Sequence, residues 1–202
     1  MSRLNRIAGV CLAGALWAAP LLAHDPKEKA PAMDEKAMME AFAKMAAVGE
    51  NHTLLAGMAG EWTSVTKMWM APGQPPQESP GTTVNTMIMG GRYLHSVHKS
   101  TVMGQPFEGI GTTAYDNLSG QFIGTWFDSM STGIFVQTGK YDAATRTFTY
   151  RGQTQDPMSP ATLVPVRSTL RLADADTHVF EWYETRDGHE ARTMEIVYKR
   201  KK

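Results

Sequence analysis

The chain has 202 residues, with 20 basic and 20 acidic side chains and a single cysteine. One domain of this length can bury a substantial core without help from metals or disulfide bonds. The balanced charge argues against a nucleic-acid-binding protein, because the only basic cluster is the short run KRKK at residues 199–202.

Residues 1–23 have the pattern of a secretory signal peptide, with Arg3 and Arg6 before an apolar run that ends at the small Ala23. The run is short for a membrane span, so no transmembrane segment is expected after cleavage. Cys11 lies inside the signal, and the bulky residue before it does not suit a lipoprotein site. The sequence therefore predicts a bacterial, periplasmic or secreted protein that is soluble and has no thiol.

Two segments separate the signal from the main domain. Residues 24–33 mix prolines with charges and predict a flexible leader. Residues 34–59 predict a helical segment, in which Asp34 caps a helix that Gly49 ends. We expect this helix to pack over an open end or the outer wall of the following domain, through an apolar face made by Met38, Phe42 and Met45.

Residues 60–202 alternate with a period of two and contain frequent turn sequences, which predicts about ten strands without intervening helices. The dipeptide DG at 187–188 and the segment ADADT at 173–177 predict hairpins. Such a meander is expected to close into an all-β, up-and-down antiparallel barrel. The expected strands lie near 61–70, 82–89, 92–101, 107–115, 121–128, 133–141, 147–154, 163–172, 178–185 and 191–200.

Closure makes the first and last strands neighbours. The first strand opens with Gly60-Glu61-Trp62 and the last ends near Arg200, whose guanidinium could then cover the Trp62 indole. This G-x-W and arginine combination resembles the signature of the calycin superfamily, which includes lipocalins, fatty-acid-binding proteins and avidins.

Longer motifs extend the resemblance over residues 50–202. The chain resembles a bacterial domain-of-unknown-function family with a lipocalin-like (calycin) barrel. The resemblance implies the fold, and no catalytic or binding residue carries over from it. The motifs are HTLLAGMAGEW (52–62), MGGRYL (89–94), GQPFEGIGTTAYDN (104–117), TWFDSMSTG (125–133), RSTLRL (167–172) and MEIVYKRK (194–201).

Charged residues that interrupt the predicted strands are the candidate ligand-binding groups, because inward-facing charges need partners inside a barrel. Arg167, Glu181 and Glu195 lie on successive strands and could form a ladder, either inside the barrel or as ion pairs facing solvent. Inside, they would form an amphipathic pocket with aromatic walls. The candidate ligand-binding residues are Arg92, Glu108, Trp126, Asp128, Arg167, Glu181, Tyr183 and Glu195.

The spacing of histidines and methionines gives little support for a metal site. His95 and His98 have opposite parity on a strand, so they cannot share a metal ion, although either could be a haem ligand. The pairs Met68-x-Met70 and Met87-x-Met89 could place two sulfurs on one strand face for Cu(I), but methionines more commonly fill cores. We predict no metal and no cofactor.

The sequence therefore predicts an exported protein that binds a small, partly apolar ligand inside a β-barrel and holds its polar or anionic head with Arg92 or Arg167. Two alternatives remain at this stage. One is a filled barrel with a structural or interaction role in the cell envelope and an unknown protein partner. The other is an acid–base enzyme that uses interior carboxylates such as Glu108 and Asp128. No nucleic-acid partner is expected.

Overall fold

The computed structural model describes residues 34–71 and 73–202, so the predicted signal (1–23) and leader (24–33) lie outside the described residues. None of the helices in the described part is both long and apolar enough to span a bilayer. The elements are α1 (Glu35–Ala46), α2 (Glu50–Ala56), β1 (Gly60–Met68), β2 (Gln77–Ile88), β3 (Tyr93–Val102), β4 (Gln105–Asp116), β5 (Gln121–Asp128), β6 (Phe135–Asp142), β7 (Thr147–Asp156), β8 (Ser159–Leu172), β9 (Thr177–Arg186) and β10 (His189–Arg200).

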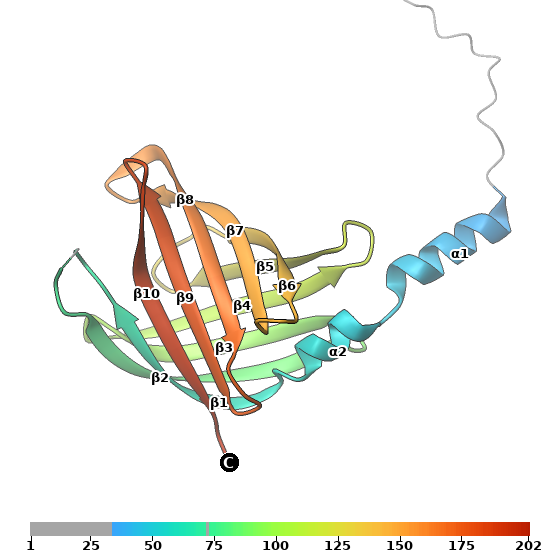
Figure 1. The fold of residues 1–202 in the computed structure, drawn as a ribbon, viewed down its shortest axis with the longest axis horizontal. Coiled ribbons are helices and arrows are strands. Elements are labelled where there is room, and N and C mark those ends of the chain that lie inside the picture. The colour runs from blue at the N-terminus through green and yellow to red at the C-terminus, as the bar shows by residue number, and fades with distance from the viewer. Residues whose placement is uncertain (1–33, 72) are drawn as a thin grey trace, which may run out of the picture.

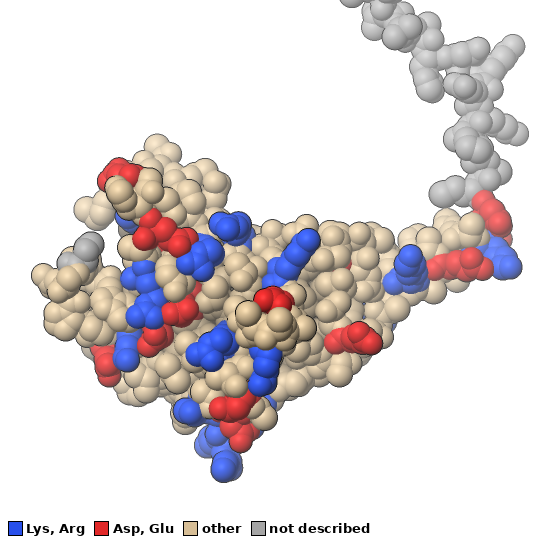
Figure 2. All heavy atoms as spheres, viewed as in Figure 1, with Lys and Arg blue, Asp and Glu red and all other residues tan. Residues whose placement is uncertain are grey.

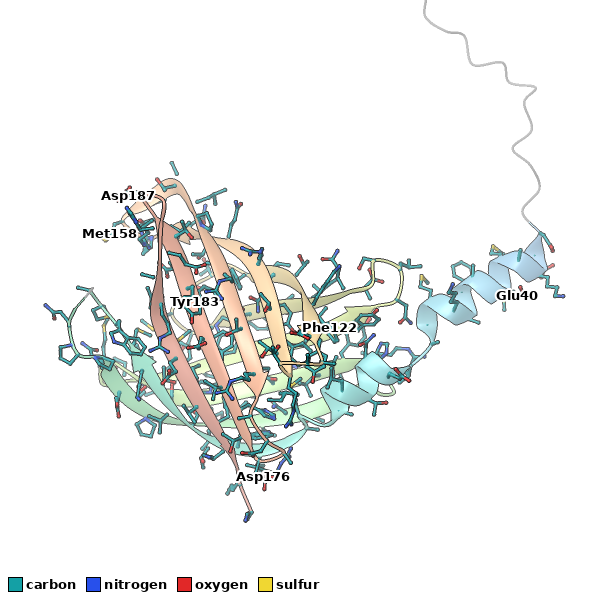
Figure 3. All side chains as sticks on the ribbon, viewed as in Figure 1. Glu40, Phe122, Met158, Asp176, Tyr183 and Asp187 are labelled. Atoms are coloured by element: carbon teal, nitrogen blue, oxygen red, sulfur yellow. The ribbon has the colours of Figure 1, made fainter. Side chains whose placement is uncertain are left out.

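Each strand pairs in antiparallel fashion with the next one in the chain, and β1 pairs with β10 to close the barrel (Figure 1). The predicted ten-stranded up-and-down barrel is therefore confirmed. Connections that follow odd-numbered strands lie at one end, which we call the mouth, and the other connections lie at the closed end. In Figure 3, Met158 and Asp187 mark the mouth, and Asp176 marks the closed end.

Tight turns at the mouth have the backbone conformations that two-residue hairpins require. Asp187 and Gly188, between β9 and β10, have φ values of 51° and 76°. Met103 and Gly104, between β3 and β4, have φ values of 50° and 75°. Positive φ at both central residues matches the twist of antiparallel strands, so the DG hairpin is confirmed.

Helix α1 does not pack over the barrel. Its N-cap forms as expected, because the Asp34 carboxylate accepts a hydrogen bond from the Lys36 amide at 3.1 Å. None of its residues is buried, and Phe42 is 52% exposed. The expectation that this helix covers the barrel is wrong, because α2 follows it and occupies the barrel end instead (Figure 1).

Helix α2 closes that end of the barrel. It contacts β2, β3 and β4, and its Leu55 is fully buried. Met58 lies two residues after the end of the helix and is 4% exposed. Together they fill the closed end with apolar side chains from the strands, which are Leu94, Phe122, Phe148, Tyr150 and Leu172.

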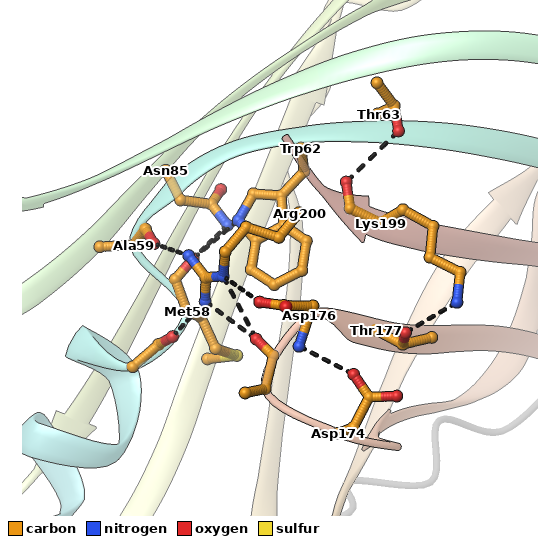
Figure 4. Close-up of polar contacts among 12 residues, drawn as sticks. Met58, Ala59, Trp62, Thr63, Asn85, Asp174, Asp176, Thr177, Lys199 and Arg200 are labelled. Carbon is orange, nitrogen blue, oxygen red and sulfur yellow. Dashed lines mark hydrogen bonds and ion pairs between the residues drawn. The ribbon is translucent and has the colours of Figure 1, made fainter. Parts of the chain in front are cut away.

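Arg200 locks the closed end by joining the last strand to the first (Figure 4). Its Cζ lies 4.2 Å from the centroid of the Trp62 ring, so the predicted contact is confirmed. The same guanidinium donates to the carbonyl oxygens of Ala59 at 2.7 Å and Gly57 at 2.9 Å. The Trp62 indole nitrogen in turn donates to the Met58 carbonyl at 3.0 Å. These bonds attach the segment after α2 to both closing strands.

Candidate functional site

Alternate residues of each strand face the barrel interior, and the buried Trp62 identifies which ones. On β1, Trp62, Ser64 and Thr66 are buried, whereas the residues between them are exposed. Cross-strand partners share one face of a sheet. Because Trp62 faces inward, its partner Thr83 on β2 also faces inward, and so does His98, the partner of Thr83 on β3. The inward residues of the remaining strands follow from the registers in the same way.

The first half of the inner wall carries a tryptophan that lies flat against glycines. The side chain of Trp126 covers Gly109 and Gly111 of the neighbouring strand β4, where any Cβ would meet the indole. The Phe107 ring lies 6.5 Å from the Trp126 ring in a stacked orientation, and the His98 ring lies 6.4 Å from it. The missing glycine side chains therefore let the ring lie along the wall.

The second half of the wall repeats this arrangement. Phe135 covers Gly152 of β7, and its ring centroid is 4.8 Å from that of Trp182 on β9. Phe180 lies 6.5 Å from Trp182 on the same strand. These rings and those of the first half form an aromatic belt on the β4–β6 and β9 parts of the lumen wall, made of Phe107, Trp126, Phe135, Phe180 and Trp182.

The belt and the mouth side of the lumen are less densely packed than the closed end. On β5, Phe122 at the closed end is 3% exposed, whereas Trp126 of the belt is half-buried. Several other inward-facing side chains toward the mouth are also half-buried, including Ser96, Ser100, Phe107, Phe135, Thr154 and Trp182. Because these side chains face inward and keep accessible surface, this part of the lumen is less tightly filled than the closed end.

Among the carboxylates that face the lumen at the mouth, two are each bound to an indole of the belt. The Trp126 indole nitrogen donates to Asp128 at 2.8 Å, and the Trp182 indole nitrogen donates to Glu184 at 3.3 Å. Glu184 also pairs with Arg186 at 2.9 Å, and Arg186 pairs with Asp156. Asp128 accepts a further bond from the Met130 amide at 2.9 Å. In the part of the chain that the structure describes, Asp128 has no cationic partner.

His98 is the buried polar group of the lumen wall. It is 5% exposed, and its Nδ1 lies 2.8 Å from the Thr83 hydroxyl. Burial lowers the pKa of His98, so the ring is neutral at pH 7. His95 faces the opposite side of the sheet, as the parity of the two residues predicted, because it pairs with Thr86 and Thr112 rather than with inward residues. The two histidines therefore cannot share a metal ion.

Two of the eight predicted site residues, Trp126 and Asp128, face the lumen together. Arg92 does not, because it lies in the turn before β3 and donates to the carbonyl oxygens of Ala46 and Met89, each at 3.0 Å. Glu108 faces outward and pairs with Lys99 at 3.5 Å. The expected acid–base pair of Glu108 and Asp128 is therefore wrong, since the two residues are on opposite faces.

The other four predicted residues lie on the outer face of β8–β10. Arg167 binds Glu190 through two bonds of 2.7 and 2.9 Å and covers the Tyr183 ring at 3.9 Å. Of the two possible positions for the charged ladder, the inside of the barrel is wrong and the solvent-facing one agrees with the structure, although Arg167 pairs with Glu190 rather than with Glu181 or Glu195. Figure 2 shows acidic and basic side chains next to one another over the outer face of these strands.

Arg192, which was not among the predicted residues, organises the remaining part of that outer network. Its guanidinium bonds to Glu181 at 2.6 Å and to Glu195 at 2.7 Å. It also lies 4.7 Å from the ring of Trp69. Arg192 faces outward because a register shift precedes Met194 on β10, and such a shift is not visible in the alternation of the sequence.

The methionine pairs considered for Cu(I) do not lie within single strands, because the strands end too early. Met68 ends β1 and Met70 lies in the following loop, while Met89 lies in the turn after β2. Among residues 34–71 and 73–202, the structure contains no group of three acidic, histidine or cysteine side chains placed to hold a metal ion.

Sequence reasoning missed several lumen residues, above all Phe107, Phe135, Phe180, Trp182 and Glu184. A signal for them is present in two places. The motifs TWFD (125–128) and EWYE (181–184) both place a carboxylate two residues after a tryptophan, hence on the same face of a strand. The motif GIG (109–111) marks two wall positions that have no side chain.

Comparison with solved structures shows the fold alone. The chain is similar to Rv2717c from M. tuberculosis, with a TM-score of 0.57 and 14% identity over 77% of this chain and 100% of that one. It is also similar to the S-type phycobiliprotein lyase CPES from Guillardia theta, with a TM-score of 0.51 and 9% identity over 76% of this chain and 94% of that one. A comparison with curated proteins found no match. The family model described as "Protein of unknown function (DUF1579)" matches residues 47–200, and the chain therefore belongs to that family.

Proposed function

We propose that the protein binds a small, partly apolar molecule in the lumen of its barrel. The observation that carries this proposal is the position of the belt rings. Trp126 and Phe135 lie against glycines of the wall, while the neighbouring inward side chains remain half-buried. Aromatic walls with a few placed polar groups are typical of small-molecule sites.

The polar end of the ligand would meet hydrogen-bonding groups rather than a free arginine, because the inward-facing Arg186 is already paired with Glu184 and Asp156. The proposal of an anionic head depended on Arg92 or Arg167, and neither side chain faces the lumen. The groups that do face it are Asp128, Glu184 and the neutral His98, with the hydroxyls of Ser96 and Ser100. We therefore restrict the proposal to ligands whose polar end is not anionic.

The chemistry of the mouth supports entry of an apolar molecule there. Of the five connections at the mouth, Asp187-Gly188 carries a carboxylate. The other four lie within residues 69–76, 103–106, 129–134 and 157–160 and contain no charged side chain. Each of these segments carries an exposed methionine, namely Met70, Met103, Met130 and Met158. Flexible thioether side chains adapt to apolar molecules of different shape. The proposal that the protein is exported rests only on the sequence of residues 1–23.

A lumen-filling substitution tests the proposal. Isothermal titration with 1-naphthalenemethanol, a neutral bicyclic alcohol, should show saturable binding to the parent protein. Thr154 faces the lumen and is half-buried, so Thr154→Trp should place an indole in the binding space and weaken binding by about tenfold or more.

The neighbouring residue provides the control. Gln153 is exposed on the outer face of the same strand, and Gln153→Trp adds the same side chain outside the barrel. This variant should bind like the parent. Equal loss in both variants, or no saturable binding to the parent protein, would contradict the proposal.

A further inference from the structure

We infer that the lumen selects ligands that carry a positive charge, that is, organic cations with an apolar body. This inference rests on the proposed function and names the ligand class for the same lumen. It is carried by three features: the charges that face the lumen, the belt next to them, and buried polar atoms left without partners.

The inward-facing charges at the mouth are mainly negative. They are Asp128, Asp156, Glu184 and Arg186, and the single cation among them already binds two of the three carboxylates. Asp128 is left without an ion-pair partner in the described residues, and it is half-buried. A partly buried carboxylate interacts more strongly with a charge than an exposed one does, because solvent screens it less. The lumen therefore favours a cation over an anion.

The belt places aromatic rings next to this carboxylate. Asp128 is held by the Trp126 indole nitrogen at 2.8 Å, so the carboxylate and the indole occupy the same part of the wall. The Phe107 ring lies 6.5 Å from the Trp126 ring. The face of an aromatic ring attracts a cation through its quadrupole, most strongly when water is excluded. A cation bound beside Asp128 would thus gain from both the carboxylate and the rings.

Two buried polar atoms of the same wall have no hydrogen-bond partner among the described residues. They are the Oγ of Ser64, a residue that is 4% exposed, and the Oδ1 of Asn85. Buried polar atoms usually have partners, so unpaired ones in a lumen point to a bound group. Because burial lowers the pKa of His98, the ring adds no positive charge that would repel a cation.

The test compares three ligands that share a naphthalene ring and differ only in the charge of the head. They are 1-naphthylmethylamine, which is protonated at neutral pH, 1-naphthalenemethanol, which is neutral, and 1-naphthoate, which is anionic. In calorimetric titrations of the parent protein, the amine should bind about tenfold more tightly than the alcohol, and the naphthoate more weakly than either. The preference for the amine should shrink as the salt concentration rises.

Removing the charge of Asp128 then tests whether this carboxylate is the source of the preference for the amine. Asp128→Asn keeps an oxygen that can accept the Trp126 hydrogen bond but removes the charge, so affinity for the amine should fall about tenfold more than affinity for the alcohol. Glu108→Gln is the matched control, because Glu108 lies beside this position on the outer face. It should leave all three affinities unchanged.

The possible failures can be told apart. If none of the three naphthalenes binds the parent protein, the proposed function itself fails. If the alcohol binds but the amine gains nothing over it, or if the naphthoate binds most tightly, lumen binding stands and the inference about charge is wrong. Equal loss of amine binding in Asp128→Asn and Glu108→Gln would also overturn the assignment to Asp128.

Discussion

Single side chains determine how the closed end is sealed. Arg200 stacks on Trp62 and donates to carbonyl oxygens of the segment between α2 and β1, so one guanidinium holds three parts of the chain. The His178 ring also contacts Trp62, with the two ring centroids 4.2 Å apart. We therefore expect stability to change when Arg200 is substituted and when the pH changes the protonation of His178.

Arg200→Lys should lower the free energy of unfolding by about 1–3 kcal/mol, because an ammonium cannot reproduce the planar fork of donors or the stacking on Trp62. Urea unfolding followed by tryptophan fluorescence would measure the change. Arg171→Lys, at an exposed position on β8, should leave stability nearly unchanged. An equal loss in both variants would show that the closed-end contacts contribute nothing specific.

His178 predicts a particular dependence of stability on pH. Burial, with the nearby Arg200 charge, lowers the pKa of His178 in the folded protein to about 4, from 6.5. Between these two values the unfolded chain binds a proton that the folded protein does not, so the free energy of unfolding should fall as pH is lowered from 6.5 toward 4. Urea unfolding at a series of pH values would show this slope.

The variant His178→Phe keeps a ring against Trp62 but cannot titrate, so its stability should fall less steeply over that pH range. Some slope should remain, because burial also lowers the pKa of His98. His189→Phe, at an exposed position, is the control and should keep the full slope. A slope that is identical in all three proteins would rule out His178 as its source.

The direction in which individual side chains face was the property least predictable from the sequence. Trp62 could be recognised as a buried anchor, because its motif and Arg200 were both visible in the sequence. The facing of Arg167 could not be derived, since it depends on the number of residues in each preceding hairpin. A change of one residue reverses the face of every later side chain in a strand. This is why the sequence could not separate Trp126 and Asp128, which face the lumen, from Arg167 and Tyr183, which face outward.

At the scale of elements, the two helices have different roles despite their proximity in the chain. Helix α2 has only seven residues, yet its Leu55 is fully buried beneath the barrel. Helix α1 is longer, but it contributes no buried residue. Its C-terminus is held by polar contacts alone, since Asn117 donates to the Ala47 carbonyl at 2.8 Å and Arg92 donates to that of Ala46.

This difference in burial predicts that truncating a side chain of α2 lowers the free energy of unfolding more than truncating a side chain of α1. Leu55→Ala should lower the free energy of unfolding by about 2–5 kcal/mol, because it removes buried methyl groups and leaves a cavity. Phe42→Ala on α1 should cost less than about 0.5 kcal/mol, because the ring is already exposed. Urea unfolding of the two variants would decide, and a larger cost for Phe42→Ala would mean that α1 packs against the barrel in solution.

The strands were predictable as elements because alternation and turn residues agree with each other along β1–β10. The predicted ends of the strands were less accurate than their existence. For example, β8 was expected to begin at residue 163, and it begins at Ser159. Helix α2 was missed as a separate element, since seven residues are too few for a helical period to show. Its burial comes from packing against the barrel and not from a pattern of its own.

At the scale of the whole molecule, packing changes along the barrel axis. Large apolar side chains fill the closed end, where Phe122 and Phe148 are buried, and α2 seals it. Toward the mouth, glycines replace side chains on the wall and the rings lie flat against it. One end of the barrel thus supplies stability and leaves the other free to bind a ligand. This gradient could not be predicted from the sequence, because it requires knowing which glycines face inward.

The most direct test of this account is a crystal structure of the protein grown with saturating 1-naphthalenemethanol. The account predicts electron density for the naphthalene ring inside the barrel, in contact with Trp126 and Phe135, while both side chains remain against their glycines. A lumen filled by these two rings after they turn away from Gly109 and Gly152, with the alcohol absent or bound only to the outer surface, would contradict it.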